Sequence, residues 1–302
     1  MLKGISGTTA AVAVGIAALL TGCGPSAGPA ETPAAAGPNS LTTPSAVVTE
    51  TAQNRLIDTP DIAMEELSPE AAEYLASRPG PISAAVLVPE RGAIYTWNGH
   101  EQLHMASVAK VAIMVTVLRQ AAEQGRELTS EEIALLTPMI AVSDNPSATA
   151  LWNQVGGGLV VEDVMRSAGL NEITPDRTSC WGASYASAHD VAMLFGLLAW
   201  GDILPPKERE FALNLLQQID PSQTWGVVAA SPAELPNGTV IGVKDGWYPA
   251  DCGWWVNSAG MILPGNEKPA YTIAVLTGEQ PTLEAGIETL ETFGELIHEA
   301  LH

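Results

Sequence analysis

One long apolar segment lies in the middle of the chain, where residues 107–125 have the sequence SVAKVAIMVTVLRQAAEQG. The apolar pattern predicts a helix that begins at Val108 and is stopped by Gly125. At its start, Ser107 and Lys110 are three residues apart, which places both side chains on one face of the helix. A serine hydroxyl is a poor nucleophile by itself, but a neutral lysine amine beside it can remove its proton. The pair alone is weak evidence, because a serine followed three residues later by a lysine is common by chance.

A second polar pattern, Ser143–Asp144–Asn145, begins 36 residues after Ser107 and stands directly before Pro146. Since proline suits the first turn of a helix, we expect a loop that leads into a helix. The Ser143 hydroxyl could relay a proton, and the Asn145 amide could both donate to and accept from a substrate amide. The alternative is an ordinary Asx-type helix cap.

A third pattern, Lys244–Asp245–Gly246, stands at the end of a predicted strand about 100 residues further on. The lysine could hold an anionic group, and the glycine would let the backbone approach a ligand and help to form an oxyanion hole. The alternative is a turn with a solvated lysine.

The order and spacing of the three patterns are more specific than any one of them. A Ser-x-x-Lys on a helix, a Ser-Asp-Asn in a loop and a Lys-x-Gly on a strand resemble the penicillin-recognising serine enzymes, and most closely the class A β-lactamases. The resemblance extends from about residue 65 to residue 302 and includes the order of elements. It implies an α/β (α+β) fold with a five-stranded antiparallel sheet, flanked by N- and C-terminal helices, and a separate all-helical lobe.

The same resemblance implies a serine hydrolase or acyl transferase that forms a covalent acyl-enzyme. Ser107 would be the acylated nucleophile, Lys110 its base, and Ser143 the residue that passes the proton to the leaving nitrogen. Lys244 would hold the proton network and the substrate carboxylate. The substrate-binding residues would be Asn145, Asp245, Gly246 and Trp247, with the backbone N–H groups of Ser107 and Trp247 as the oxyanion hole.

The chain departs from the family at two positions. Class A enzymes carry a glutamate after the helical block that activates the deacylating water, and Ser179 stands at the corresponding place. The family's K-T-G hydroxyl residue is Asp245 here, and a carboxylate at that position would repel a substrate carboxylate. The changes predict either a persistent acyl-enzyme with poor β-lactam turnover or an inactive site that binds cell-wall peptide or a protein partner. An efficient β-lactamase with another deacylation base is a third alternative.

The N-terminus resembles a bacterial lipoprotein signal. Residues 1–22 contain one cation and an apolar run that is shorter than a membrane span, and Leu-Thr-Gly precedes Cys23 as in a lipobox. The alternative is an ordinary secretory signal, which would also export the protein. Residues 23–62, rich in Pro, Ala and Thr, predict a disordered tether after a lipidated Cys23, with the folded domain at 63–302. We expect the protein on the outer face of the bacterial cell membrane, held by its lipid anchor.

Two cysteines remain after Cys23, and an oxidising compartment favours a disulfide between Cys180 and Cys252, with two buried free thiols as the alternative. Four tryptophans near these segments could stack on a sugar or an acyl chain, or belong to the core. They are Trp181, Trp247, Trp254 and Trp255.

The periodicity predicts an opening helix and a hairpin, a middle that is helical throughout, three late strands and a last helix. The predicted late elements are strands 240–244, 254–262 and 271–276 and helix 283–301.

The composition excludes several functions. The 34 acidic residues outnumber the 13 basic ones, and the net charge of −21 with scattered cations excludes nucleic acid as a partner. The five histidines show no HxH or HExxH spacing, so we predict no metal and no cofactor. The expected ligands are a cell-wall peptide, a β-lactam or an ester-like small molecule, bound by a monomer.

Overall fold

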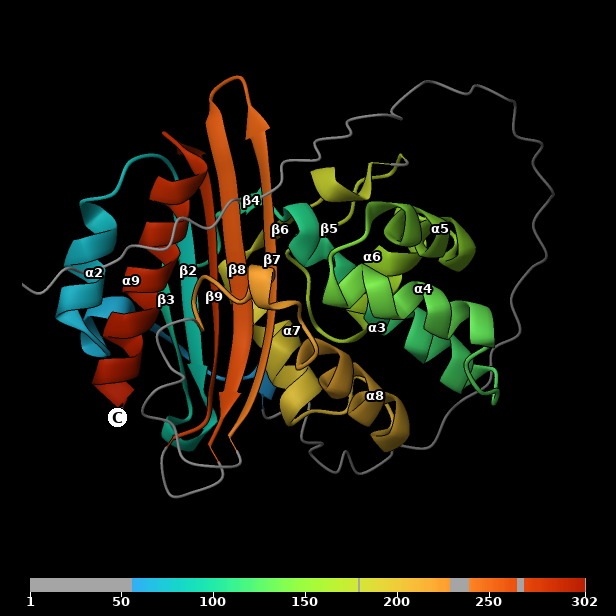
Figure 1. Cartoon of the computed structure of the whole chain (residues 1–302). Helices are drawn as coiled ribbons and strands as arrows, with labels where there is room; N and C mark the ends of the chain where they lie inside the picture. The colour runs from blue at the N-terminus through green and yellow to red at the C-terminus, as the bar shows by residue number, and fades with distance from the viewer. Residues whose placement is uncertain (1–55, 179, 229–238, 265–268, 302) are drawn as a thin grey trace, which may run out of the picture. The chain divides into compact units, whose positions relative to one another are not determined.

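A six-stranded sheet forms the centre of the described chain, with the strand order β1-β3-β2-β9-β8-β7 (Figure 1). The structure is a computed structural model that describes residues 56–178, 180–228, 239–264 and 269–301. Neighbouring strands are antiparallel except for β1 and β3, which are parallel. The strands are β1 (Asp61–Ala63), β2 (Ile82–Val88), β3 (Ala93–Trp97), β7 (Val240–Ala250), β8 (Gly253–Leu263) and β9 (Tyr271–Gln280).

The prediction of five antiparallel strands is wrong by one strand. Residues Asp61–Ala63 pair with Ile94–Thr96 of β3, and Leu56 is buried in the core. A strand of three residues is too short to show a period, and its first two residues lie in the segment 23–62 that we assigned to the tether. The predicted domain boundary at residue 63 therefore falls inside the sheet.

Helices cover both faces of the sheet. Figure 1 shows α2 (Pro69–Ala76) and α9 (Leu283–Leu301) on one face, and α7 (Ala188–Ala199) with the other helices on the opposite side. The remaining helices of the described chain are α3 (Ala109–Glu123), α4 (Ser130–Ala141), α5 (Asn145–Val155), α6 (Gly158–Ser167) and α8 (Pro206–Leu216). Within the described residues no helix combines the length and the apolar character that crossing a membrane requires.

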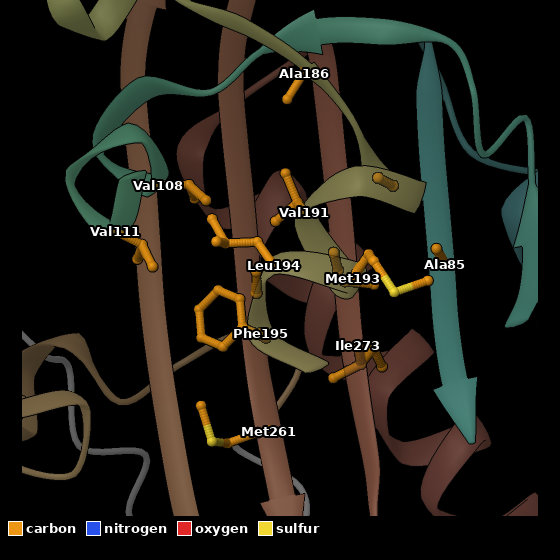
Figure 2. Packing of buried hydrophobic residues seen from close by; sticks show 14 of the residues in the cluster. Ala85, Val108, Val111, Ala186, Val191, Met193, Leu194, Phe195, Met261 and Ile273 are labelled. Atoms are coloured by element: carbon orange, nitrogen blue, oxygen red, sulfur yellow. The ribbon is translucent and has the colours of Figure 1, made fainter. Parts of the chain in front are cut away.

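Helix α7 joins the sheet to the helical region. Figure 2 shows Leu194 and Phe195 of α7 pointing toward the strands, among side chains that include Met261 of β8 and Ile273 of β9. All four residues are fully buried. Because every residue from Val191 to Leu198 is buried, α7 lacks the polar face of a surface helix. Helix α7 therefore packs the helical region against the sheet.

Three short strands interrupt the middle region, which we predicted to be helical throughout. β4 (Gln102–His104), β5 (Ile173–Thr174) and β6 (Tyr185–Ser187) form a small sheet in the order β4-β6-β5. β4 leads into a 3-10 turn, η3 (Ala106–Val108), that continues into α3. The small sheet therefore positions the start of α3, where Ser107 lies.

Candidate active site

Ser107 lies in the turn between β4 and α3. Ala106 before it has φ +48°, a left-handed conformation that an alanine adopts only when its surroundings impose it. The turn is held on one side by the Met105 N–H, which donates to the Ser184 carbonyl at 2.8 Å. On the other side lies Gly246 of β7, where an added Cβ would stand 2.6 Å from the Ser107 nitrogen. Only glycine lets the strand approach the Ser107 backbone this closely.

Lys110 is the centre of the polar network and is fully buried. Its Nζ lies 3.0 Å from Ser107 Oγ, 2.5 Å from the Ser143 carbonyl, 2.8 Å from Ser143 Oγ and 2.8 Å from Asn145 Oδ1. Burial, together with the nearby charge of Lys244, lowers the pKa of Lys110 to about 6, although Asp144 acts in the opposite direction. The amine is therefore largely neutral at pH 7 and has a lone pair that can take the Ser107 proton.

Ser143 joins the two buried lysines. Its backbone has φ +57°, and this conformation directs both its carbonyl and its hydroxyl at Lys110. Lys244 Nζ lies 3.1 Å from the same hydroxyl. Burial lowers the pKa of Lys244 to about 8, while Asp245 acts in the opposite direction. The Ser143 hydroxyl thus lies between a neutral amine and an ammonium group, as a proton relay requires.

The loop after Ser143 is both a helix cap and part of the site, so the two alternatives for this pattern are compatible. Asp144 is the N-cap of α5 and accepts from the Ser147 N–H at 2.7 Å. The cap begins the helix at Asn145, whose Oδ1 accepts from Lys110. Asn145 is exposed, so a substrate can reach its side chain.

Lys244 and Gly246 lie inside strand β7, not at its end as predicted. Gly246 and Pro249 suggest a strand end in sequence, but β7 is an edge strand, where both residues are tolerated. Because side chains alternate along a strand, positions 244 and 246 share one face of β7, and this face lies toward Ser107. The Trp247 backbone follows Gly246 directly, and the Trp247 ring packs edge to face on Trp225 with centroids 5.4 Å apart.

Asp245 points away from Ser107, which contradicts its predicted place in the substrate site. It is opposite Ser258 on β8, and its Oδ1 is 3.3 Å from where a Cβ on Gly226 would stand. Both carboxyl oxygens are buried, and the Ser258 hydroxyl and Lys244 only partly oppose the effect of this burial. Burial raises the pKa of this carboxyl well above its usual range, which favours the uncharged form. We therefore no longer expect Asp245 to repel a substrate carboxylate.

Trp181 lies directly beside Lys110, a contact that the sequence did not indicate. Lys110 Nζ lies 4.8 Å from the centre of its ring, and its indole Nε1 donates to Thr149 Oγ1 at 3.1 Å. Ser179, at the predicted glutamate position, lies outside the described residues. No carboxylate of the described chain hydrogen-bonds to Ser107 or Lys110, whose oxygen partners are a carbonyl, two hydroxyls and an amide. Trp255 and Trp254 lie elsewhere, and Trp255 packs edge to face on His104.

The predicted disulfide between Cys180 and Cys252 does not form, because Cys252 is free and exposed. β7 and β8 are 11 residues each, longer than predicted, so their turn at Asp251 and Cys252 projects beyond the other strands (Figure 1). Cys252 therefore lies in solvent at the tip of the hairpin. Cys23, the predicted lipidation site, lies outside the described residues.

Comparison with known proteins agrees with this geometry. The model of the β-lactamase enzyme family matches residues 125–301. A β-lactamase from Chitinophaga pinensis superposes with a TM-score of 0.67 and 19% identity, covering 78% of this chain and all of that one. The ancestral GNCA class A β-lactamase superposes with a TM-score of 0.65 and 23% identity, covering 78% and 99%. The protein thus has a class A β-lactamase-like fold.

The chain belongs to the β-lactamase enzyme family. It is also distantly homologous to a Mycobacterium tuberculosis protein named "Putative lipoprotein LppW", with 29% identity over 201 residues. The match covers 65% of this chain and 63% of that relative.

Proposed function

We propose that this protein is an exported, lipid-anchored serine hydrolase or acyl transferase that forms an acyl-enzyme on Ser107. One observation carries the proposal: a fully buried lysine with a pKa of about 6 stands 3.0 Å from the Ser107 hydroxyl. Burying an amine costs stability. A buried lysine with a lowered pKa beside a serine hydroxyl is therefore typical of a catalytic base.

In the proposed acylation, neutral Lys110 takes the proton of Ser107 while Oγ forms a bond to the substrate carbonyl carbon. The carbonyl oxygen becomes negatively charged and is held by the backbone N–H groups of Ser107 and Trp247. When the tetrahedral intermediate collapses, Ser143 gives its proton to the leaving nitrogen or oxygen and regains one from protonated Lys110. Lys244 keeps the Ser143 hydroxyl oriented and supplies positive charge for an anionic substrate group.

We propose that deacylation is slow. Deacylation needs a water and a base next to the ester. In the described part of the site the ring of Trp181 lies beside Lys110, and its indole cannot act as a base. The substrate classes are a β-lactam, a peptidoglycan-derived peptide amide or an ester. The name of the LppW relatives and the Cys23 motif support a lipoprotein on the outer face of the membrane.

An inactive binding protein is the competing proposal. It is motivated by the substitutions at Ser179 and Asp245. Because Asp245 points away from Ser107, Asp245 no longer supports an inactive site. Burst kinetics with a chromogenic ester and a chromogenic cephalosporin separate the two proposals. We expect a burst of one product per enzyme followed by a slow phase, absent in Ser107→Ala. A folded wild type without a burst on either substrate would favour the binding protein.

A further inference from the structure

Two histidines from distant parts of the sequence meet at the surface, outside the hydrogen-bond network of Ser107 and Lys110. His100 follows β3, and His189 is near the start of α7. Their rings stack with centroids 4.7 Å apart. Asp61 of β1 stands beside both rings, with Oδ2 3.2 Å from His100 Nε2 and Oδ1 3.9 Å from His189 Nε2. One ligand atom from each of the three residues lies within 4.8 Å of the others.

The outer nitrogens of both imidazoles are held by carboxylates. His100 Nδ1 donates to Glu172 Oε2 at 2.9 Å, and His189 Nδ1 donates to Asp190 Oδ1 at 2.8 Å. Metal-binding histidines typically donate one ring N–H to a carboxylate, which fixes the tautomer and turns the other nitrogen toward the metal. Both rings show this arrangement, with Nε2 as the nitrogen that faces Asp61.

The backbone holds these residues in place. The His189 N–H donates to the Gly99 carbonyl at 2.9 Å, which connects the start of α7 to the segment that carries His100. Asp190 Oδ2 accepts from the Glu172 N–H at 2.6 Å. Asp61 lies on β1, whose register is fixed by pairing with β3. A ligand set on paired strands and a helix end is better defined than one on a loop.

The charges at the cluster favour a cation. Asp61, Glu172 and Asp190 are three carboxylates, and each forms its ion pairs in the described chain with a histidine and not with a lysine or an arginine. With neutral imidazoles they leave an excess of negative charge. The side chains of His100 and Asp61 are 50% and 43% exposed, so an ion can enter from solvent.

We propose that Asp61, His100 and His189 bind one divalent transition-metal ion of the Zn²⁺ type through two imidazole nitrogens and a carboxylate. Tetrahedral ligands with bonds of about 2.0–2.1 Å stand roughly 3.3 Å apart. The separation of 3.2 Å between His100 Nε2 and Asp61 Oδ2 matches that value. His189 Nε2 is 3.9 Å from the other Asp61 oxygen, and the three ligand atoms lie within 4.8 Å of one another, so the His189 ring has to move toward the ion. The ion takes the place of a proton on Nε2, which leaves to solvent, and water fills the fourth position. The sequence could not show this site, because 89 residues separate His100 from His189.

The test is Zn²⁺ titration of the untagged full-length protein by calorimetry, with metal content measured after dialysis and a thermal melt in parallel. We use Cys252→Ser as the background, because an exposed thiol can bind zinc by itself. We expect one saturable Zn²⁺ per chain and a raised melting temperature, with no comparable binding of Mg²⁺, which prefers oxygen ligands. Co²⁺ should give the visible bands of a tetrahedral site.

Substitutions in the cluster identify the ligands. Asp61→Asn and His100→Asn should each weaken Zn²⁺ binding at least about tenfold, and Glu172→Gln, which removes an orienting carboxylate, by about 10- to 100-fold. Asp58→Asn is the matched control, since Asp58 is a nearby exposed carboxylate outside the cluster. Absence of saturable binding, or binding that Asp61→Asn and His100→Asn leave unchanged, would overturn the proposal. The substituted residues form no hydrogen bond with Ser107 in the described chain, so a failed burst assay does not affect this result.

Discussion

The protonation of Lys110 sets the pH dependence of acylation at Ser107. With a pKa of about 6, roughly 90% of the amine is neutral at pH 7, whereas an ordinary lysine at 10.5 would be only about 0.03% neutral. Burial beside Lys244 therefore raises the population of the base about 3,000-fold. We infer that this enrichment is the main contribution of the fold to the reactivity of Ser107.

The assay is the second-order rate constant of acylation by an activated ester, measured across pH. Protonation of Lys110 removes the base, so the rate should fall about tenfold per pH unit below about pH 6 and level off above it. In Lys244→Met the loss of the neighbouring charge raises the pKa of Lys110, and the break should move to higher pH. A rate that is flat across pH 6, or a break at the same pH in both proteins, would show that Lys110 is not the base.

Three other substitutions test the geometry. Gly246→Ala places a Cβ 2.6 Å from the Ser107 nitrogen, so acylation should fall at least about tenfold with about 1–3 kcal/mol of destabilisation in urea unfolding; unchanged kinetics would contradict the close approach. Asp245→Asn replaces a carboxyl that points away from Ser107 and whose pKa is raised by burial, so acylation by anionic and neutral esters should change in the same proportion; a selective gain for the anionic ester would place Asp245 in the site. Phe195→Ala opens a cavity between α7 and the sheet and should cost about 3–5 kcal/mol in urea unfolding, and a cost below about 1 kcal/mol would contradict its role in the core.

The sequence predicted the parts of the fold that have long periodic segments. The long helix after Ser107 and the last helix agree with the structure because their apolar faces repeat over many turns. Strand β1 and the small sheet of β4, β5 and β6 were missed, since two or three residues carry no period. The extent of β7 was also missed, because Gly246 and Pro249 suggest a strand end unless the strand is known to lie at an edge.

The candidate site was predictable only where residues lie within one local pattern. Ser107 and Lys110 are one helical turn apart, and their contact follows from that spacing. The direction of the Asp245 side chain depends on which face of β7 lies toward α3. The pairing of strands across the sheet decides this, and it is not visible in the local sequence. Trp181 reaches Lys110 through folding of a segment 71 residues away, for which the sequence holds no local signal.

Intact-protein mass spectrometry shows whether Ser107 is a working nucleophile. The protein is incubated with a penicillin and, separately, with an activated ester, and peptide mapping then locates the added mass. We expect one stable adduct on Ser107 in the wild type and none in Ser107→Ala, with the adduct persisting long after free reagent is removed. A folded wild-type protein that gains no mass from either reagent, or gains it equally in Ser107→Ala, would contradict acyl-enzyme formation at Ser107.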